Sequence, residues 1–314
     1  MTALDRTSLR GVWGTVLLPL DAAGRIDVGR LRRELDALTA AGLDGIYAHG
    51  TAGEFHELGE DEWDLVSELV AGHALAAGLP FQLGAGHMSA HLSRDRVRRA
   101  ARLGPGAIQV ILPDWVPTPP AGVVAAVGGL ADAAGGIPLV LYNPPHAKTR
   151  LDPGALIRLA DEVPQLIGIK VAGGDAGWYQ AMRPVTARLA VFVAGHTLAS
   201  GLARGAAGSY SNVACLSPAG AVAWYQMMTA DPDRAADVEG RLRSFLDRHI
   251  MPFQRRGLAN PALDKALAHI GAWADIGTRV RWPYQGVPED EATALRPLAR
   301  AAVPELFPPA VRAR

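Results

Sequence analysis

The sequence predicts an α/β fold, a (β/α)8 barrel (TIM barrel) followed by a C-terminal helical extension. Eight short apolar runs alternate with segments of helical periodicity through about residue 230. The 314 residues, 49% of them hydrophobic, suit one such barrel with an appendage. An open doubly wound sheet is the second choice, because no Gly-x-Gly-x-x-Gly turn follows the first run. We expect residues 1–230 to form the barrel and residues 231–314 the extension.

The expected strands are short apolar runs bounded by turn residues. In chain order they cover residues 12–19, 45–49, 80–85, 107–112, 138–142, 166–170, 190–194 and 208–211. Apolar residues between the strands recur at helical spacing, as in the stripe Val28, Leu31, Leu35 and Leu38. Further helices are expected at 61–77 and 89–103, and in the extension at 237–249 and 262–270.

Four helix starts carry a capping residue directly before a proline. A capping side chain accepts a hydrogen bond from the first turn, where proline is well tolerated. The four pairs are Thr118-Pro119, Asp152-Pro153, Ser217-Pro218 and Asn260-Pro261.

Composition excludes several classes of protein. The formal net charge is +0, from 31 basic and 31 acidic residues without a basic stretch, which argues against nucleic acid or an anionic membrane as partner. Cys215 is the single cysteine, so an intrachain disulfide and a cysteine-rich zinc site are excluded. Residues 1–10 lack a signal-peptide core, and no apolar run approaches the ~20 residues of a membrane span. We therefore expect a cytoplasmic protein.

The sixth expected strand ends in a lysine, Lys170. The strand is apolar on both faces, as in buried parallel sheets. Strict alternation places Leu166, Gly168 and Lys170 on one face and Ile167, Ile169 and Val171 on the other. A desolvated lysine loses its proton more readily and then forms imines with ketones. The alternative is a lysine that extends from the strand end to water.

Other candidate site residues also follow apolar runs directly. In parallel barrels the active site forms where the strands end. A glycine turn containing Thr51 and Ala52 follows the second run, and its backbone N–H groups suit a carboxylate. Tyr142 alternates with Val140 and is expected to face inward, although a core tyrosine is an equal alternative. Runs seven and eight add Gly195, His196 and Tyr210.

Taken in order, these motifs resemble the dihydrodipicolinate synthase/N-acetylneuraminate lyase family of class I lyases. The matching pieces are 24–27 (Gly-Arg-Ile-Asp), 42–46, 50–54 (Gly-Thr-Ala-Gly-Glu), 142–145 (Tyr-Asn-Pro-Pro), 168–170 (Gly-Ile-Lys), Gly195, 260–261 and 279–283. The resemblance implies a (β/α)8 barrel assembled as a homotetramer or homodimer. It implies a Schiff base between Lys170 and a 2-oxo acid without any cofactor. It further implies that Tyr142 moves protons and that the turn with Thr51 holds the substrate carboxylate.

Departures from the synthase pattern bear on the substrate. Ala52 replaces the second threonine of the turn, Asp114 and Trp115 stand where a tyrosine pair is expected, and Lys148 alone could replace a carboxylate-binding arginine. His196 stands where sialic acid lyases use acidic side chains. We expect pyruvate or a 2-keto-3-deoxy sugar acid as ligand, with retro-aldol cleavage or dehydration as the reaction. Alternatives are condensation of pyruvate with aspartate semialdehyde, and a homologue that binds a 2-oxo acid without catalysis.

Other polar residues allow further readings. A metal-dependent lyase could draw on histidines near strand ends, but none has the i, i+4 spacing of a helical metal motif, and we expect no metal. We expect His196 and His87 to contact substrate hydroxyls. Glu54 is expected to cap the following helix. Trp115 could reach a neighbouring subunit's site or pack an interface. The histidines are His49, His56, His87, His146 and His196.

Overall fold

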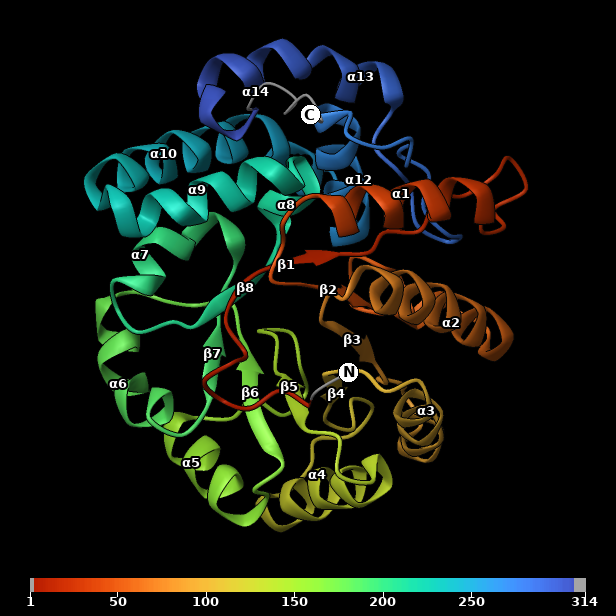
Figure 1. Cartoon of the computed structure of the whole chain (residues 1–314), viewed down its shortest axis with the longest axis vertical. Helices are drawn as coiled ribbons and strands as arrows, with labels where there is room; N and C mark the ends of the chain where they lie inside the picture. The colour runs from red at the N-terminus through yellow and green to blue at the C-terminus, as the bar shows by residue number, and fades with distance from the viewer. Residues whose placement is uncertain (1–2, 308–314) are drawn as a thin grey trace.

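A computed structural model describes residues 3–307 and confirms the predicted barrel. Within these residues, eight parallel strands pair in chain order and β8 closes onto β1 (Figure 1). The strands are β1 (Gly11–Thr15), β2 (Gly45–Ala48), β3 (Phe81–Gly84), β4 (Ala107–Ile111), β5 (Leu139–Tyr142), β6 (Leu166–Lys170), β7 (Ala190–Phe192) and β8 (Gly208–Ser211). The first strand is shorter than expected, because the buried residues 16–19 leave the sheet after Thr15.

Helices surround the barrel and connect its strands. They are α1 (Val28–Ala40), α2 (Glu60–Ala77), α3 (Ala90–Arg102), α4 (Pro120–Ala134), α5 (Pro153–Glu162), α6 (Ala176–Thr186), α7 (Leu198–Leu202), α8 (Asn212–Leu216) and α9 (Pro218–Ala230). The extension adds α10 (Pro232–Phe245), a π-helical turn (Leu246–Ile250), α11 (Met251–Arg255), α12 (Asn260–Gly271), α13 (Glu289–Ala294) and α14 (Arg296–Ala302). These helices gather over one side of the barrel (Figure 1), where α12 packs against α8. The boundary at residue 230 stays a prediction.

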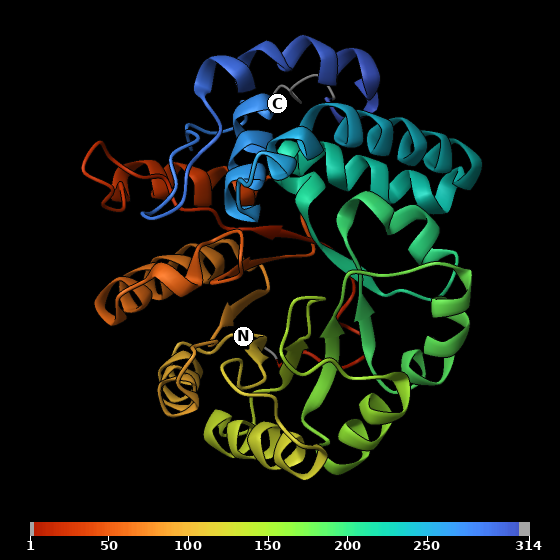
Figure 2. The ribbon, with the colours of Figure 1, turned by 180° about the vertical axis from the view of Figure 1, so that it is seen from behind.

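The barrel interior is filled by its own small cluster of side chains, while a larger apolar layer lies between strands and helices. The N-terminal segment crosses the end of the barrel that faces the reader in Figure 1, and Figure 2 shows the opposite end. Leu9 of this segment is fully buried in the interior cluster. A β-carbon on Gly168 would lie 2.7 Å from Leu9 Cδ2. The glycine in β6 therefore leaves the space that the Leu9 side chain fills. The substrate site must therefore lie toward the other end.

The strict alternation expected along β6 is wrong at its start. The register between β5 and β6 shifts after Leu139, which pairs with Leu166, whereas Val140 pairs with Gly168. This irregularity turns Leu166 into the outer layer and leaves Ile167 against the interior cluster. Beyond it the expected alternation holds, because Ile169 packs outside and Lys170 ends the strand on the inner face.

Two of the four proline caps are confirmed and two are wrong by one residue. Asp152 and Ser217 accept hydrogen bonds from the first turns of α5 and α9. Helix α4 instead begins at Pro120, since the second proline of Pro119-Pro120 also fits a first helical position. Helix α12 begins at Asn260, whose side chain donates to Asp264 one turn later. None of the helices within residues 3–307 has both the length and the apolar character needed to cross a bilayer.

Candidate active site

Lys170 lies among three tyrosine rings where β6 ends. It pairs in register with Tyr142 on β5, and its Nζ lies 4.4 Å from the centre of the Tyr142 ring. The rings of Tyr47 and Tyr210 lie 5.1 Å and 5.3 Å from the same atom. Tyr47 and Tyr210 separate the amine from water on the side of the barrel interior, while Lys170 stays partly exposed toward the cavity. Burial lowers the pKa of Lys170 to about 8, against an opposing attraction to Asp264. Part of the amine is therefore unprotonated near neutral pH, as a nucleophile requires.

The rings of Tyr210 and Tyr47 lie beside the amine on the side of the barrel interior, and Tyr210 also lines the cavity. The Tyr210 hydroxyl donates to Gln82 Oε1 at 2.7 Å, and the Tyr47 hydroxyl donates to Gln109. Both glutamines are buried in the barrel. The Tyr210 hydroxyl is thus directed into the barrel interior, and the residue lines the cavity through its ring.

A cavity of about 250 Å³ opens above Lys170. Thr51 and Ala52 of the glycine turn line it together with Tyr142. The Thr51 hydroxyl donates to the Tyr142 hydroxyl over 3.4 Å, a long contact that leaves the phenol available to a ligand. Burial raises the pKa of Tyr142, so the phenol keeps its proton at neutral pH and can donate it. The structure therefore brings Lys170, Tyr142, Thr51 and Ala52 together.

The turns after β7 and β8 form the opposite wall. His196 lines the cavity, and its backbone N–H donates to Asn212 Oδ1 at 3.2 Å. Burial lowers the pKa of His196, so its imidazole is neutral at neutral pH. Gly195 does not line the cavity. A β-carbon there would lie 2.5 Å from Ser211 Oγ, so the glycine allows this turn to pack against the start of α8.

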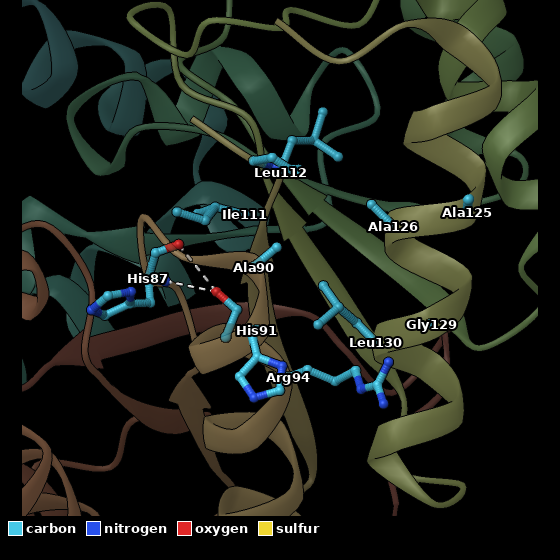
Figure 3. Close-up of a pocket in the computed structure, with 12 residues that line it drawn as sticks. His87, Ala90, His91, Arg94, Ile111, Leu112, Ala125, Ala126, Gly129 and Leu130 are labelled. Atoms are coloured by element: carbon cyan, nitrogen blue, oxygen red, sulfur yellow. Dashed lines mark hydrogen bonds between the residues drawn. The ribbon is translucent and has the colours of Figure 1, made fainter. Parts of the chain in front are cut away.

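Lys148 and His87 lie outside this cavity. The Lys148 side chain is exposed, and its backbone N–H donates to Asp114 Oδ1 at 3.1 Å. His87 belongs to a second cavity of about 320 Å³, in which α3 and α4 face each other beyond β4 (Figure 3). Trp115 is 74% exposed. The structure thus does not bring these three residues to the Lys170 amine.

Glu54 stands at the N-cap position of the 3-10 turn Phe55–Glu57, but contrary to expectation its side chain makes no capping hydrogen bond. The residue has a left-handed backbone (φ 50°), and its buried carboxylate pairs with Lys265 of α12. The other oxygen accepts from the backbone N–H of Arg281 at 2.7 Å. Two residues of the extension, Lys265 and Arg281, therefore hold the glycine turn in place through the Glu54 carboxylate.

Helices α8 and α12 also supply cavity residues that sequence reasoning missed. Asp264 and Asn260 of α12 line the cavity, as does the buried Cys215 of α8. Asn260 Nδ2 donates to Asp264 Oδ2 at 2.7 Å. The available signal was an acid and a lysine, Asp264 and Lys265, inside the otherwise apolar stretch 261–268. Across residues 3–307, no three His, Cys, Asp or Glu side chains gather in a way that could hold a metal ion.

The fold and the site define a closed eight-stranded parallel barrel with a lysine amine at the carboxyl end of its sixth strand. The chain belongs to the dihydrodipicolinate synthetase family, whose family model matches residues 8–302.

Several relatives carry the name 4-hydroxy-tetrahydrodipicolinate synthase. The protein of that name from Stenotrophomonas maltophilia is 32% identical over 176 residues, which are 56% of this chain and 58% of that protein. The match with the first of these relatives therefore spans little more than half of the relative's length. A further synthase, from Cereibacter sphaeroides, is 29% identical over 270 residues, 84% of this chain and 89% of that protein.

Solved structures share the fold at lower identity. YagE, a prophage protein of the dihydrodipicolinic acid synthase family from E. coli K12 determined in complex with pyruvate, has a TM-score of 0.82 at 23% identity, over 94% of this chain and 98% of that chain. The sialic acid aldolase of Ruminococcus gnavus has a TM-score of 0.81 at 19% identity, over 95% and 98% of the two chains. At such identities the likeness shows the fold alone.

Proposed function

We propose that this chain is a class I lyase that forms a Schiff base between Lys170 and a 2-oxo acid. Its substrate class is a 2-keto-3-deoxy sugar acid, which it cleaves by retro-aldol reaction or dehydrates. The observation that carries the proposal is the Lys170 amine, which lies 4.4 Å from the Tyr142 ring centre and beside a cavity lined by Thr51. A partly deprotonated amine, a phenol and a turn rich in backbone donors are what imine chemistry on a 2-oxo acid requires.

Each residue has a defined task in this proposal. The turn amides around Ala52 and the Thr51 hydroxyl bind the substrate carboxylate. The Lys170 amine attacks the ketone carbon, and Tyr142 donates the proton with which the ketone oxygen leaves as water. The resulting iminium is an electron sink, which allows a bond one carbon further along the substrate to break. The covalent imine replaces a cofactor.

The second candidate is condensation of pyruvate with aspartate semialdehyde, which the relatives named as synthases favour. The side chains that depart from the synthase pattern are those expected to relay protons during condensation and to bind the second substrate. Ala52 lacks a hydroxyl beside Thr51, and the exposed Lys148 lies outside the cavity. Turnover of pyruvate plus aspartate semialdehyde at a higher kcat/KM than any sugar acid would favour this candidate.

A screen of 2-oxo acids tests the proposal. We expect the wild-type chain to act on 2-keto-3-deoxy sugar acids, followed through released pyruvate or, for dehydration, through a semialdehyde product. Lys170→Ala should abolish turnover. Failure on the whole panel by folded wild-type protein would favour a non-catalytic 2-oxo acid binder. Loss of turnover with a chelator, restored by a divalent cation, would favour a metal-dependent lyase.

We further propose that the chain assembles as a homodimer or homotetramer in the cytoplasm. Large apolar side chains are exposed at Met88 (64%), Trp115 (74%) and Val116 (64%), on segments that follow β3 and β4. Their burial against a second subunit would remove this apolar surface from water. Light scattering on the purified protein should give a mass at least twice the 33.0 kDa of one chain.

A further inference from the structure

Asp264 lies where two cavities meet. It lines the Lys170 cavity of about 250 Å³ and also an adjoining cavity of about 230 Å³ between α12 and the π-helical turn. His196, Asn212 and Asn260 line both cavities as well. A substrate fixed to Lys170 by its second carbon would extend its chain past Asp264 toward the second cavity. The carboxylate therefore faces the part of the substrate beyond the imine.

The carboxylate is held in place but keeps capacity for a ligand. It is buried, and Asn260 Nδ2 donates to Oδ2 at 2.7 Å. No other hydrogen bond to this carboxylate forms within residues 3–307, and no salt bridge of 4.0 Å or less joins it to Lys170. The next residue, Lys265, is directed away to Glu54. Asp264 and Lys170 line the same cavity, so the attraction between them acts over a distance longer than that of a salt bridge.

The charge on the Lys170 nitrogen controls the proton affinity of Asp264. Burial raises the pKa of Asp264 to about 7, while Lys170 and the Asn260 hydrogen bond oppose the rise. Other titratable groups near it are Tyr142 and Cys215, whose pKa values burial raises, and His196, whose pKa burial lowers. A protonated imine keeps a positive charge on the nitrogen and favours the carboxylate form of Asp264. When the nitrogen becomes neutral, Asp264 holds a proton more firmly.

We infer that Asp264 is the proton-transfer group for the substrate hydroxyl, and that the reaction is aldol cleavage; this inference rests on the proposed Schiff base. The proton of the hydroxyl on C4 moves to the Asp264 carboxylate, and the O–H electron pair forms the carbonyl of the departing aldehyde. The C3–C4 bond breaks, and its electron pair forms the C2–C3 double bond of an enamine. The iminium nitrogen becomes neutral in the same step, which keeps the transferred proton on Asp264.

The neighbouring groups suit this role less well. Tyr142 lines the Lys170 cavity but not the adjoining one, and it already serves the proton transfer at C2 during imine formation. The His196 ring lies 3.1 Å from the Asn212 side-chain amide through Nδ1, and burial disfavours its protonated form. Asp264 is the cavity carboxylate that both accepts and returns a proton near neutrality.

The test separates imine formation from cleavage in the variant Asp264→Asn. Pyruvate and borohydride are added, and the adduct on Lys170 is measured by mass spectrometry. Pyruvate release is measured with the 2-keto-3-deoxy sugar acid that wild-type protein turns over fastest. The matched control is Asp132→Asn, because Asp132 is an exposed carboxylate of α4 that lines neither cavity. We expect Asp264→Asn to form the adduct within about threefold of wild type, and to lose cleavage by about 10²–10⁴-fold. The control should keep cleavage within about threefold of wild type, since its carboxylate takes no part in the proton transfer.

Each other outcome overturns the inference in a recognisable way. Cleavage by Asp264→Asn at the wild-type rate would show that another group takes the proton. Loss of the adduct in this variant would show that Asp264 acts on Lys170 rather than on the hydroxyl. A wild-type product that keeps all carbon atoms of the substrate would replace cleavage by dehydration. Absence of any adduct in wild-type protein would reject the Schiff base itself.

Discussion

The carboxylate of Glu54 and the ammonium of Lys265 form a buried ion pair that ties the glycine turn after β2 to helix α12. The backbone carbonyl of Arg279 also accepts from Lys265 Nζ at 2.6 Å. The extension is thereby joined to the turn that carries Thr51, as well as supplying Asp264 to the cavity. The barrel and the extension build this site together.

Removal of Lys265 should destabilise the protein strongly. In Lys265→Met the Glu54 carboxylate stays buried without its partner, which typically costs about 3–5 kcal/mol. We expect denaturant unfolding to show a loss of this size. The control is Arg256→Met, which removes an exposed ion pair with Glu291 and should cost at most about 1 kcal/mol. Equal losses of unfolding free energy in the two variants would show that the buried pair stabilises the fold no more than the exposed pair.

The phenol of Tyr142 should be needed for turnover. We expect Tyr142→Phe to lower kcat by about 10²–10⁴-fold, because the positioned proton donor for imine formation is lost. Steady-state kinetics on the preferred 2-oxo acid measures the effect. Tyr284→Phe, on a tyrosine that is 41% exposed and does not line the cavity, is the matched control. Turnover of Tyr142→Phe near the wild-type rate would transfer the proton donation to another group or to water.

The rate of imine formation should depend on the protonation state of the Lys170 amine. The free amine is the nucleophile, so the rate of trapping with pyruvate should rise with pH and level off above the lysine's pKa of about 8. In Asp264→Asn the charge that raises this pKa is absent, so the rise should move to lower pH. Trapping rates of both proteins, measured between pH 6 and pH 10, give the wild-type pH profile and its displacement in the variant. A wild-type rate that still increases near pH 10 would show an ordinary, solvated lysine.

Glu34 of α1 should make stability fall as pH rises. It is fully buried and accepts from the Leu17 N–H at 2.6 Å, and burial raises its pKa from 4.5 to about 8. Between these values the folded protein binds more protons than the unfolded chain. The contribution of Glu34 to the free energy of unfolding is thus fully present below pH 4.5. It decreases toward pH 8, by up to about 1.4 kcal/mol per pH unit.

The variant Glu34→Gln tests this slope, because a neutral amide oxygen can still accept from Leu17. We expect unfolding free energies measured between pH 5 and pH 8 to vary less in Glu34→Gln than in wild type. Glu68→Gln, at an exposed glutamate on α2, should keep the wild-type slope. Identical slopes in Glu34→Gln and wild type would mean that Glu34 is ionised in the folded protein.

Sequence reasoning predicted the barrel because each strand is a short apolar run with its own turn signals. It predicted that Lys170, Tyr142 and Thr51 would meet because parallel strands end at one face of a barrel. Asp264 could not be found in this way, since its place depends on how α12 packs against α8, a long-range contact without a periodic signal. The outward turn of Leu166 was hidden for a similar reason, because it follows from a register shift against β5.

Borohydride trapping with pyruvate, followed by peptide mass spectrometry, tests the Schiff base most directly. Lys170 should carry the mass of pyruvate less one water plus two hydrogens, while Lys148 and Lys265 stay unmodified, and Lys170→Arg should give no adduct. An unmodified Lys170 peptide from folded wild-type protein, under conditions in which a known Schiff-base lyase is labelled, would contradict the proposed mechanism.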